Sequence, residues 1–158
     1  MNTIEIKLDK LIELSLAETE QEKNRIIDEL RHILESGGLG HYRSGPEQVI
    51  DDILVELGAP NNLLGYPYLA HAILLVMEDR MYINDITFGL YPQVAAKFDT
   101  LAARVERNIR NVIEVTFARG DTNVLHRYFG NTIKSEKGKP TNAEFISRIA
   151  NVAKRRIG

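Results

Sequence analysis

Apolar residues recur along this chain with the spacing of α-helices, and the strict alternation that is typical of β-strands is nearly absent. In the first stretch, residues 4–17, Ile4, Leu8, Leu11 and Ile12 share one helical face. A second stripe follows, made of Ile26, Ile27, Leu30, Ile33 and Leu34. The pattern therefore predicts an N-terminal helical region over residues 1–36, built from two helices.

Capping signals mark the ends of the second helix. Thr19 and Glu22 have capping-box spacing, so the Thr19 hydroxyl can accept a bond from the amide three residues on, and Glu22 can reach back. Gly37 and Gly38 end the helix. Residues 37–46 hold four glycines and Pro46, which predicts a linker between two regions.

Beyond the linker, the periodicity predicts seven further helical segments. They cover residues 46–57, 66–81, 84–90, 92–98, 101–118, 125–129 and a last helix that Thr141 caps. A basic loop over residues 131–140 precedes the last helix. The predicted fold class is all-α: a multi-helix domain over residues 47–158, preceded by the short helical pair.

Composition excludes several classes of protein. The chain contains no cysteine, which excludes disulfides, thiolate zinc sites and a cysteine nucleophile. No apolar run approaches the ~20 residues that a membrane-spanning helix needs, and the N-terminus does not resemble a signal peptide. The four histidines lack the spacing of metal ligands. We therefore expect a cytoplasmic protein without cofactor, metal or enzymatic activity.

Charge is unevenly distributed along the chain. The net charge is −2, which by itself argues against nucleic-acid binding. Residues 1–48, however, hold ten acidic and six basic residues, for a charge of −4, whereas residues 87–158 hold six acidic and thirteen basic residues, for a charge of +7. A basic segment of this kind is typical of a DNA-binding region, although a solvated basic face gives the same signal.

The predicted helix over residues 101–118 carries two chemically different faces. One is apolar and contains Val105, Ile109, Val112, Ile113 and Thr116. Arg104, Arg107, Asn108 and Asn111 lie opposite, with Arg110 on the flank. Arginine can donate two bonds to guanine, and asparagine can bond adenine in the same bidentate way. The helix therefore has the side chains of a DNA reader.

The surroundings of this helix strengthen that interpretation. Glu106 precedes Arg110 by four residues, so its carboxylate can orient the guanidinium or accept a bond from a cytosine amino group. A short helix ending at Phe98, a tight turn and then this helix form the order of a helix-turn-helix motif. A solvated arginine-rich surface helix remains the alternative.

Several stretches between residues 53 and 147 closely resemble the DNA-binding effector domain of the stage zero sporulation protein A family, the response regulators of sporulation in endospore-forming Firmicutes. These stretches are Gly65-Tyr66-Pro67-Tyr68-Leu69, Leu90-Tyr91-Pro92, Ala96-Lys97-Phe98, Arg104-Val105-Glu106-Arg107-Asn108-Ile109-Arg110, Ile113-Glu114-Val115, Ala118-Arg119-Gly120 and Lys139-Pro140-Thr141-Asn142-Ala143-Glu144-Phe145-Ile146. They are long and in order, and they span about two thirds of the chain.

The resemblance implies a six-helix effector domain that reads double-stranded DNA. Its recognition helix would enter the major groove of a TGTCGAA-like promoter box. The residues implied for base reading are Arg104, Glu106, Arg107, Arg110 and Asn111. Lys137 and Lys139, in the loop before the last helix, are similar to phosphate contacts, which position a protein without reading sequence.

The chain departs from the family pattern at three places. Asn111 stands where the family usually has histidine, so the family's base preference does not carry over at this position. Phe88 and Gly89 replace a Lys-Val pair of the family, so one contact with the DNA backbone is expected to be missing. The family also carries a receiver domain with a phosphoacceptor aspartate, whereas about 45 residues precede the effector region here. We therefore do not expect phosphorelay control through a receiver in this chain.

The N-terminal stripes predict a partner, because an isolated helix pair buries little apolar surface. We expect a homodimer, with packing of the pair within one chain as the alternative. A second function class is a helical interaction protein that binds RNA polymerase, through its sigma subunit, or the sporulation regulator itself, with weak DNA affinity.

Overall fold

The computed structural model describes residues 3–35, 45–130 and 138–158. Every regular element in these residues is helical, and no strand occurs among them, so the predicted all-α fold class is confirmed. The chain divides into two compact units, residues 1–43 and residues 44–158, and each has its own internal packing.

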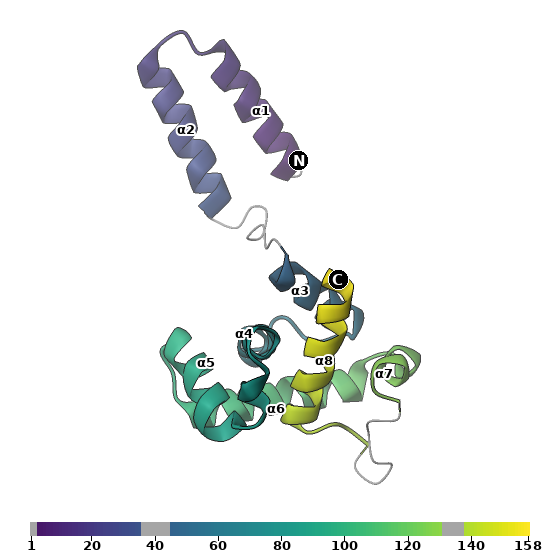
Figure 1. Ribbon diagram of the computed structural model, residues 1–158. Coiled ribbons are helices and arrows are strands. Elements are labelled where there is room, and N and C mark those ends of the chain that lie inside the picture. Colours follow the sequence, from purple (N-terminus) through teal and green to yellow (C-terminus); the bar gives the residue numbers. More distant parts are fainter. Residues whose placement is uncertain (1–2, 36–44, 131–137) are drawn as a thin grey trace. The chain divides into compact units, whose positions relative to one another are not determined.

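The N-terminal unit is a pair of helices that lie side by side, α1 (Thr3–Leu16) and α2 (Glu20–Glu35) (Figure 1). The capping box at their turn is formed. The Thr19 hydroxyl accepts a hydrogen bond from the Glu22 amide at 3.2 Å. The Glu22 carboxylate accepts one in turn from the Glu18 amide at 3.2 Å, one residue before the amide that a capping box usually engages.

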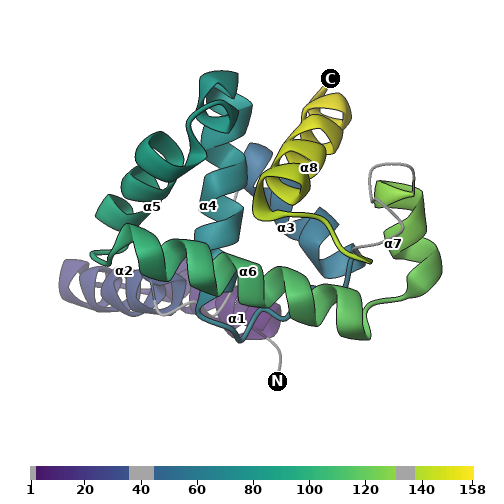
Figure 2. The same ribbon diagram turned by 90° about the horizontal axis from the view of Figure 1, so that it is seen from below.

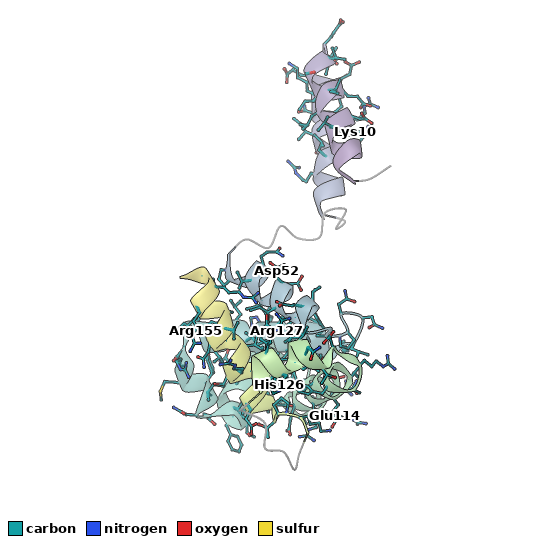
Figure 3. All side chains as sticks on the ribbon, turned by 90° about the vertical axis from the view of Figure 1, so that its right-hand side faces the viewer. Lys10, Asp52, Glu114, His126, Arg127 and Arg155 are labelled. Carbon is teal, nitrogen blue, oxygen red and sulfur yellow. The ribbon has the colours of Figure 1, made fainter. Side chains whose placement is uncertain are left out.

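An ion pair joins the two N-terminal helices. Lys10 Nζ on α1 lies 2.5 Å from a carboxylate oxygen of Glu29 on α2, and Figure 3 labels this lysine on the helix pair. Hydrogen bonding to Glu29 raises the pKa of Lys10, and the same bond lowers the pKa of Glu29. Since both side chains remain partly exposed, this pair fixes geometry more than it adds stability.

The apolar stripe of α1 stays open to solvent. Leu8, Leu11 and Ile12 are between 51% and 58% exposed, and Leu16 is 73% exposed. On α2, Ile26 is buried, and it is the sole buried residue among the described side chains of this unit. The described part of the pair therefore leaves most of its apolar surface uncovered.

The described part of residues 44–158 contains six α-helices, the number that the resemblance implied. They are α3 (Pro46–Glu56), α4 (Gly65–Glu78), α5 (Tyr91–Lys97), α6 (Ala102–Arg119), α7 (Thr122–Phe129) and α8 (Asn142–Ile157). Two short helical turns, η1 (Arg80–Ile83) and η2 (Ile86–Leu90), connect α4 to α5.

The ends of α3 follow the predicted signals, but the end of α4 does not. Pro46 occupies the first turn of α3, and Gly58, with φ of +78°, follows the helix. The sequence predicted one helix over residues 66–81, which is wrong, because α4 ends at Glu78. Asp79 is extended there, and its carboxylate accepts a bond from the Met81 amide at 2.9 Å. That side-chain cap starts the separate turn η1.

Helix α4 lies at the centre of the C-terminal unit. It packs against α6 and α8, and α3 packs against α8. Tyr66 and Tyr68 at its start are both buried. A second part of the core is aromatic, because the Phe129 ring stacks on Phe145 with 5.1 Å between centroids and meets Phe117 edge-on at 5.3 Å.

Helices α5 and α6 form a helix-turn-helix. α5 packs along α6, and the chain turns between them at Asp99, which has φ of +50°. Aspartate tolerates this left-handed conformation better than most residues other than glycine. The Thr100 amide donates to the Ala95 carbonyl at 3.0 Å, which closes the turn. This short connection fixes where α6 starts relative to α5.

Candidate nucleic-acid interface

Helix α6 is the helix that the sequence predicted over residues 101–118. Its apolar face is buried as predicted, since Val105, Ile109 and Val112 have no exposed surface and Ile113 has almost none. Thr116 is also buried, and its hydroxyl donates to the Val112 carbonyl at 2.7 Å. Figure 2 shows α6 running across the C-terminal unit, with α5 beside its first half. One whole side of α6 is therefore held by the core.

Gly65 permits a very close approach of α4 to the middle of α6. A Cβ atom at position 65 would lie 2.1 Å from the Asn108 carbonyl oxygen and 2.9 Å from the Val112 side chain. Any side chain here would push the two helices apart. This contact sets the depth at which α6 sits in the unit.

The opposite side of α6 is open and basic. Arg104, Arg107, Arg110 and Asn111 are all exposed. Together with Leu64, Asn108 and Glu114 they line an open hollow of about 790 Å³. The structure thus brings four of the five predicted base-reading residues into one surface.

The fifth predicted residue, Glu106, does not line this hollow. Its carboxylate instead holds Arg110 across one helical turn, at 2.5 Å, so the predicted pair exists. Glu106 and Arg110 both border a neighbouring cleft of about 440 Å³. Asn108 is half-buried, and its amide donates to the Arg104 carbonyl at 2.7 Å. Arg110 therefore lies between the hollow and the cleft, and Glu106 orients its guanidinium.

Lys139, one of the two residues predicted to contact the DNA backbone, forms an ion pair with α6. Its Nζ lies 2.8 Å from a carboxylate oxygen of Glu114 on α6, and Figure 3 labels this glutamate. Hydrogen bonding from Lys139 lowers the pKa of Glu114. The other predicted contact, Lys137, lies outside the described residues. The charge of Lys139 is thus paired with a carboxylate of α6 in the free protein.

The sequence of residues 50–153 matches the family described as "Sporulation initiation factor Spo0A C terminal". The chain belongs to this family. The match covers about two thirds of the chain, and it contains α6 and the turn before it. The matched region is a DNA-binding effector domain of a sporulation regulator, and the family is one of regulatory domains rather than of enzymes.

The described residues of this Spo0A-family chain add two findings. No helix among residues 3–35, 45–130 and 138–158 combines the length and the apolar character needed to cross a membrane. Within the same ranges, no three His, Asp or Glu side chains gather in a way that would hold a metal ion.

Sequence reasoning missed Asn142, whose hydrogen bonds connect three helices of the effector domain. Asn142 is buried at the start of α8, and its amide donates to the Tyr91 hydroxyl and to the Glu106 carbonyl, both at 3.1 Å. Burial raises the pKa of Tyr91, which keeps its hydroxyl protonated. One side chain therefore joins α5, α6 and α8. In the sequence, this residue follows the Thr141 cap and lies in a stretch that resembles the family, but neither pattern indicates its partners.

The cap at Thr141 itself is present. Its hydroxyl accepts a bond from the Glu144 amide at 3.2 Å, as the capping-box spacing predicted. The cap fixes the start of α8, and with it the position of Asn142 one residue later. Local capping and the longer-range contacts of Asn142 thus support the same part of the effector domain.

Proposed function

We propose that this effector domain is a sequence-specific reader of double-stranded DNA that places α6 in the major groove of a TGTCGAA-like box, and that it acts in the cytoplasm as a transcription regulator. The observation that carries the proposal is the common exposure of Arg104, Arg107, Arg110 and Asn111 on one side of a helix whose other side is fixed in the core. A reader needs donors that are held before DNA arrives.

The roles of these side chains follow from the donor and acceptor pattern of the bases. Arg104 and Arg107 lie in the first half of α6, which is the half that meets bases in helix-turn-helix proteins, and each can donate two bonds to guanine O6 and N7. Asn111 can bond adenine N6 and N7. Glu106 holds Arg110 for a further base, or accepts a bond from a cytosine amino group.

Phosphate contacts come from the loop before α8. We assign them to Lys137 and Lys139, which would position the domain without reading sequence. Lys139 must exchange its Glu114 partner for a phosphate oxygen on binding. Since both side chains of that ion pair are almost half exposed, the exchange costs little.

The test is a titration by fluorescence anisotropy. A labelled duplex with the TGTCGAA box is compared with a scrambled duplex at two salt concentrations, with the wild type and with Arg107→Ala. We expect clear preference for the box, and a loss of about 1–3 kcal/mol in Arg107→Ala together with relaxed specificity. Arg155→Ala, on the last turn of α8, is the matched control. Equal binding of both duplexes by the wild type would contradict the proposal.

We further propose that the N-terminal helix pair forms a homodimer. Four apolar side chains of α1 are more than half exposed, and Ile27 of α2 is 40% exposed, so a second copy of the same stripe would cover them. Light scattering at micromolar concentration should give the mass of two chains. Leu11→Asp should give the mass of one, whereas Glu20→Gln, an exposed position at the start of α2, should leave the dimer intact.

The same exposed stripe favours one other function, that of an interaction protein. In this case, residues 1–43 would bind RNA polymerase through its sigma subunit, or the sporulation regulator, and DNA affinity would be weak. Deletion of residues 1–43 separates the two candidates. If the protein is a DNA reader, the truncated chain still binds the box more tightly than the scrambled duplex. If it is an interaction protein, the truncated chain no longer binds its protein partner, and neither form prefers the box.

A further inference from the structure

Two exposed leucines lie on or next to the proposed reading surface, which is the exposed side of α6 that carries Arg104, Arg107, Arg110 and Asn111. Leu64, at the start of α4, is 63% exposed and lines the same hollow as Arg104, Arg107 and Asn111. Leu101, directly before α6, is 64% exposed. An exposed leucine by itself needs no explanation, so what matters is where the backbone holds these two.

The backbone holds Leu64 beside the middle of the recognition helix. It is the residue before Gly65, and Gly65 lies against the Asn108 carbonyl with no room for a Cβ atom. Leu64 has helical backbone angles, with φ of −56° and ψ of −33°, so it continues directly into α4. The Leu64 backbone is therefore held beside the hollow as long as Gly65 stays packed against α6.

Leu101 occupies a position where an apolar residue is unfavourable. It is the N-cap of α6, with an extended backbone, and its side chain makes no capping bond. Serine, threonine, aspartate or asparagine would accept a bond from the free amides of the first turn. Leu101 also precedes Arg104 by three residues and Asn108 by seven, so it continues their stripe. Helix stability alone does not account for a leucine here.

We infer that Leu64 and Leu101 are specificity-determining residues that read thymine by contact with its C5 methyl group. This inference rests on the proposed function, since it requires α6 to lie in the major groove. Thymine is the base that presents an apolar group on its major-groove edge, and apolar side chains are the groups that recognise it. Arginines line the hollow beside Leu64, and Arg104 follows Leu101 by three residues, so their attraction to phosphate would bring both leucines to the bases.

The experiment replaces each thymine of the box duplex, one at a time, by deoxyuridine, which lacks only the methyl group. Each duplex is titrated with the wild type, Leu64→Ala, Leu101→Ala and Leu64→Met. We expect the wild type to lose about fourfold in affinity at two thymines, the factor that corresponds to burial of one methyl group. Each alanine variant should lose sensitivity at one of these thymines and keep it at the other, and Leu64→Met should retain it.

Val55→Ala is the matched control, because Val55 on α3 is 60% exposed but does not line the hollow. It should behave as the wild type on every duplex. Circular dichroism checks that the alanine variants, which change only exposed side chains, remain folded.

The outcomes separate this inference from the proposed function. If the box is preferred over the scrambled duplex but deoxyuridine has no effect in the wild type, the inference is wrong and the proposed function stands. Uniform weakening of all duplexes by Leu64→Ala and Leu101→Ala would assign the leucines to sugar contacts, which also overturns it. If neither variant changes the response to deoxyuridine, the inference is also wrong, and the leucines would be assigned to contact with a protein partner. Equal binding of box and scrambled duplexes overturns both proposals.

Discussion

The two units of this protein use similar amphipathic helices but bury them very differently. In the N-terminal pair, Leu8, Leu11 and Ile12 remain more than half exposed, and an ion pair between Lys10 and Glu29 joins the helices. In the effector domain, the corresponding face of α6 is fully buried against α4. An apolar stripe therefore identifies the face of a helix that needs cover, but it does not identify what supplies that cover.

The largest expected difference between the units is in stability. Phe145→Ala removes a fully buried ring that stacks on Phe129, and it should lower the free energy of unfolding by about 3–5 kcal/mol. Leu11→Ala changes a side chain that is 55% exposed, and it should leave the unfolding of the effector domain unchanged. Urea denaturation followed by circular dichroism measures both. A large loss of effector-domain stability in Leu11→Ala would show that the two units share a core.

Close packing of α4 on α6 gives the next largest effect. Gly65→Ala forces a Cβ atom against the Asn108 backbone, and it should cost about 1–3 kcal/mol of stability as well as DNA affinity, because α6 shifts. Gly89→Ala is the control, since the atoms nearest to its Cβ would belong to the Asp85 side chain, the first at 3.3 Å. Thermal melting and the anisotropy titration test both variants. Normal DNA binding by Gly65→Ala would contradict the rigid seating of α6.

A smaller effect distinguishes the ion pairs of the two units. Glu114→Gln releases Lys139 beside the reading surface, so DNA affinity should rise by less than about 1 kcal/mol. Glu29→Gln removes the ion pair between α1 and α2 and leaves Lys10 paired with Glu13, and DNA affinity should not change. Titrations at two salt concentrations compare the variants. An equal gain in both would mean that total charge matters rather than the position of the charge.

The smallest effect is a dependence of stability on pH in the effector domain. Hydrogen bonds from Tyr128, at 2.6 Å, and from Arg156, at 3.1 Å, lower the pKa of Glu56 below its ordinary 4.5. A lowered pKa adds stability above the ordinary value, and that stability is lost as the pH falls through the lowered pKa. Because Glu56 is more than a third exposed, we expect less than about 1 kcal/mol.

The measurement for Glu56 is urea denaturation at several pH values between 6 and about 3, with Glu56→Gln beside the wild type. The two stability curves should converge as the pH falls. Curves that remain parallel over the whole range would contradict a role of Glu56 in the pH dependence.

The sequence predicted those parts of the fold that depend on local patterns. Both faces of α6 were predicted correctly because the 3.6-residue period separates Val105 and Ile109 from Arg104 and Arg107. The end of α4 was missed, since Asp79 stops the helix without a glycine or proline to mark it. The base-reading roles of the arginines remain predictions.

Contacts between residues far apart in sequence could not be predicted in this way. Asn142 bonds partners that lie 36 and 51 positions earlier, and no local period records such a pairing. The hollow beside α6 was missed for the same reason, because Leu64 reaches it from another helix. Tertiary hydrogen bonds and shared surfaces require the fold to be known first.

Asn142 also limits how this domain can be engineered. Its amide, at the beginning of α8, bonds the beginning of α5 and the backbone of α6, so these three segments are held together. A chimera that grafts only residues 91–119 onto another scaffold would carry the arginines but lose the bonds of Asn142 to Tyr91 and to the Glu106 carbonyl. Exchange of DNA preference between related regulators should therefore transfer the first turn of α8 together with the helix-turn-helix.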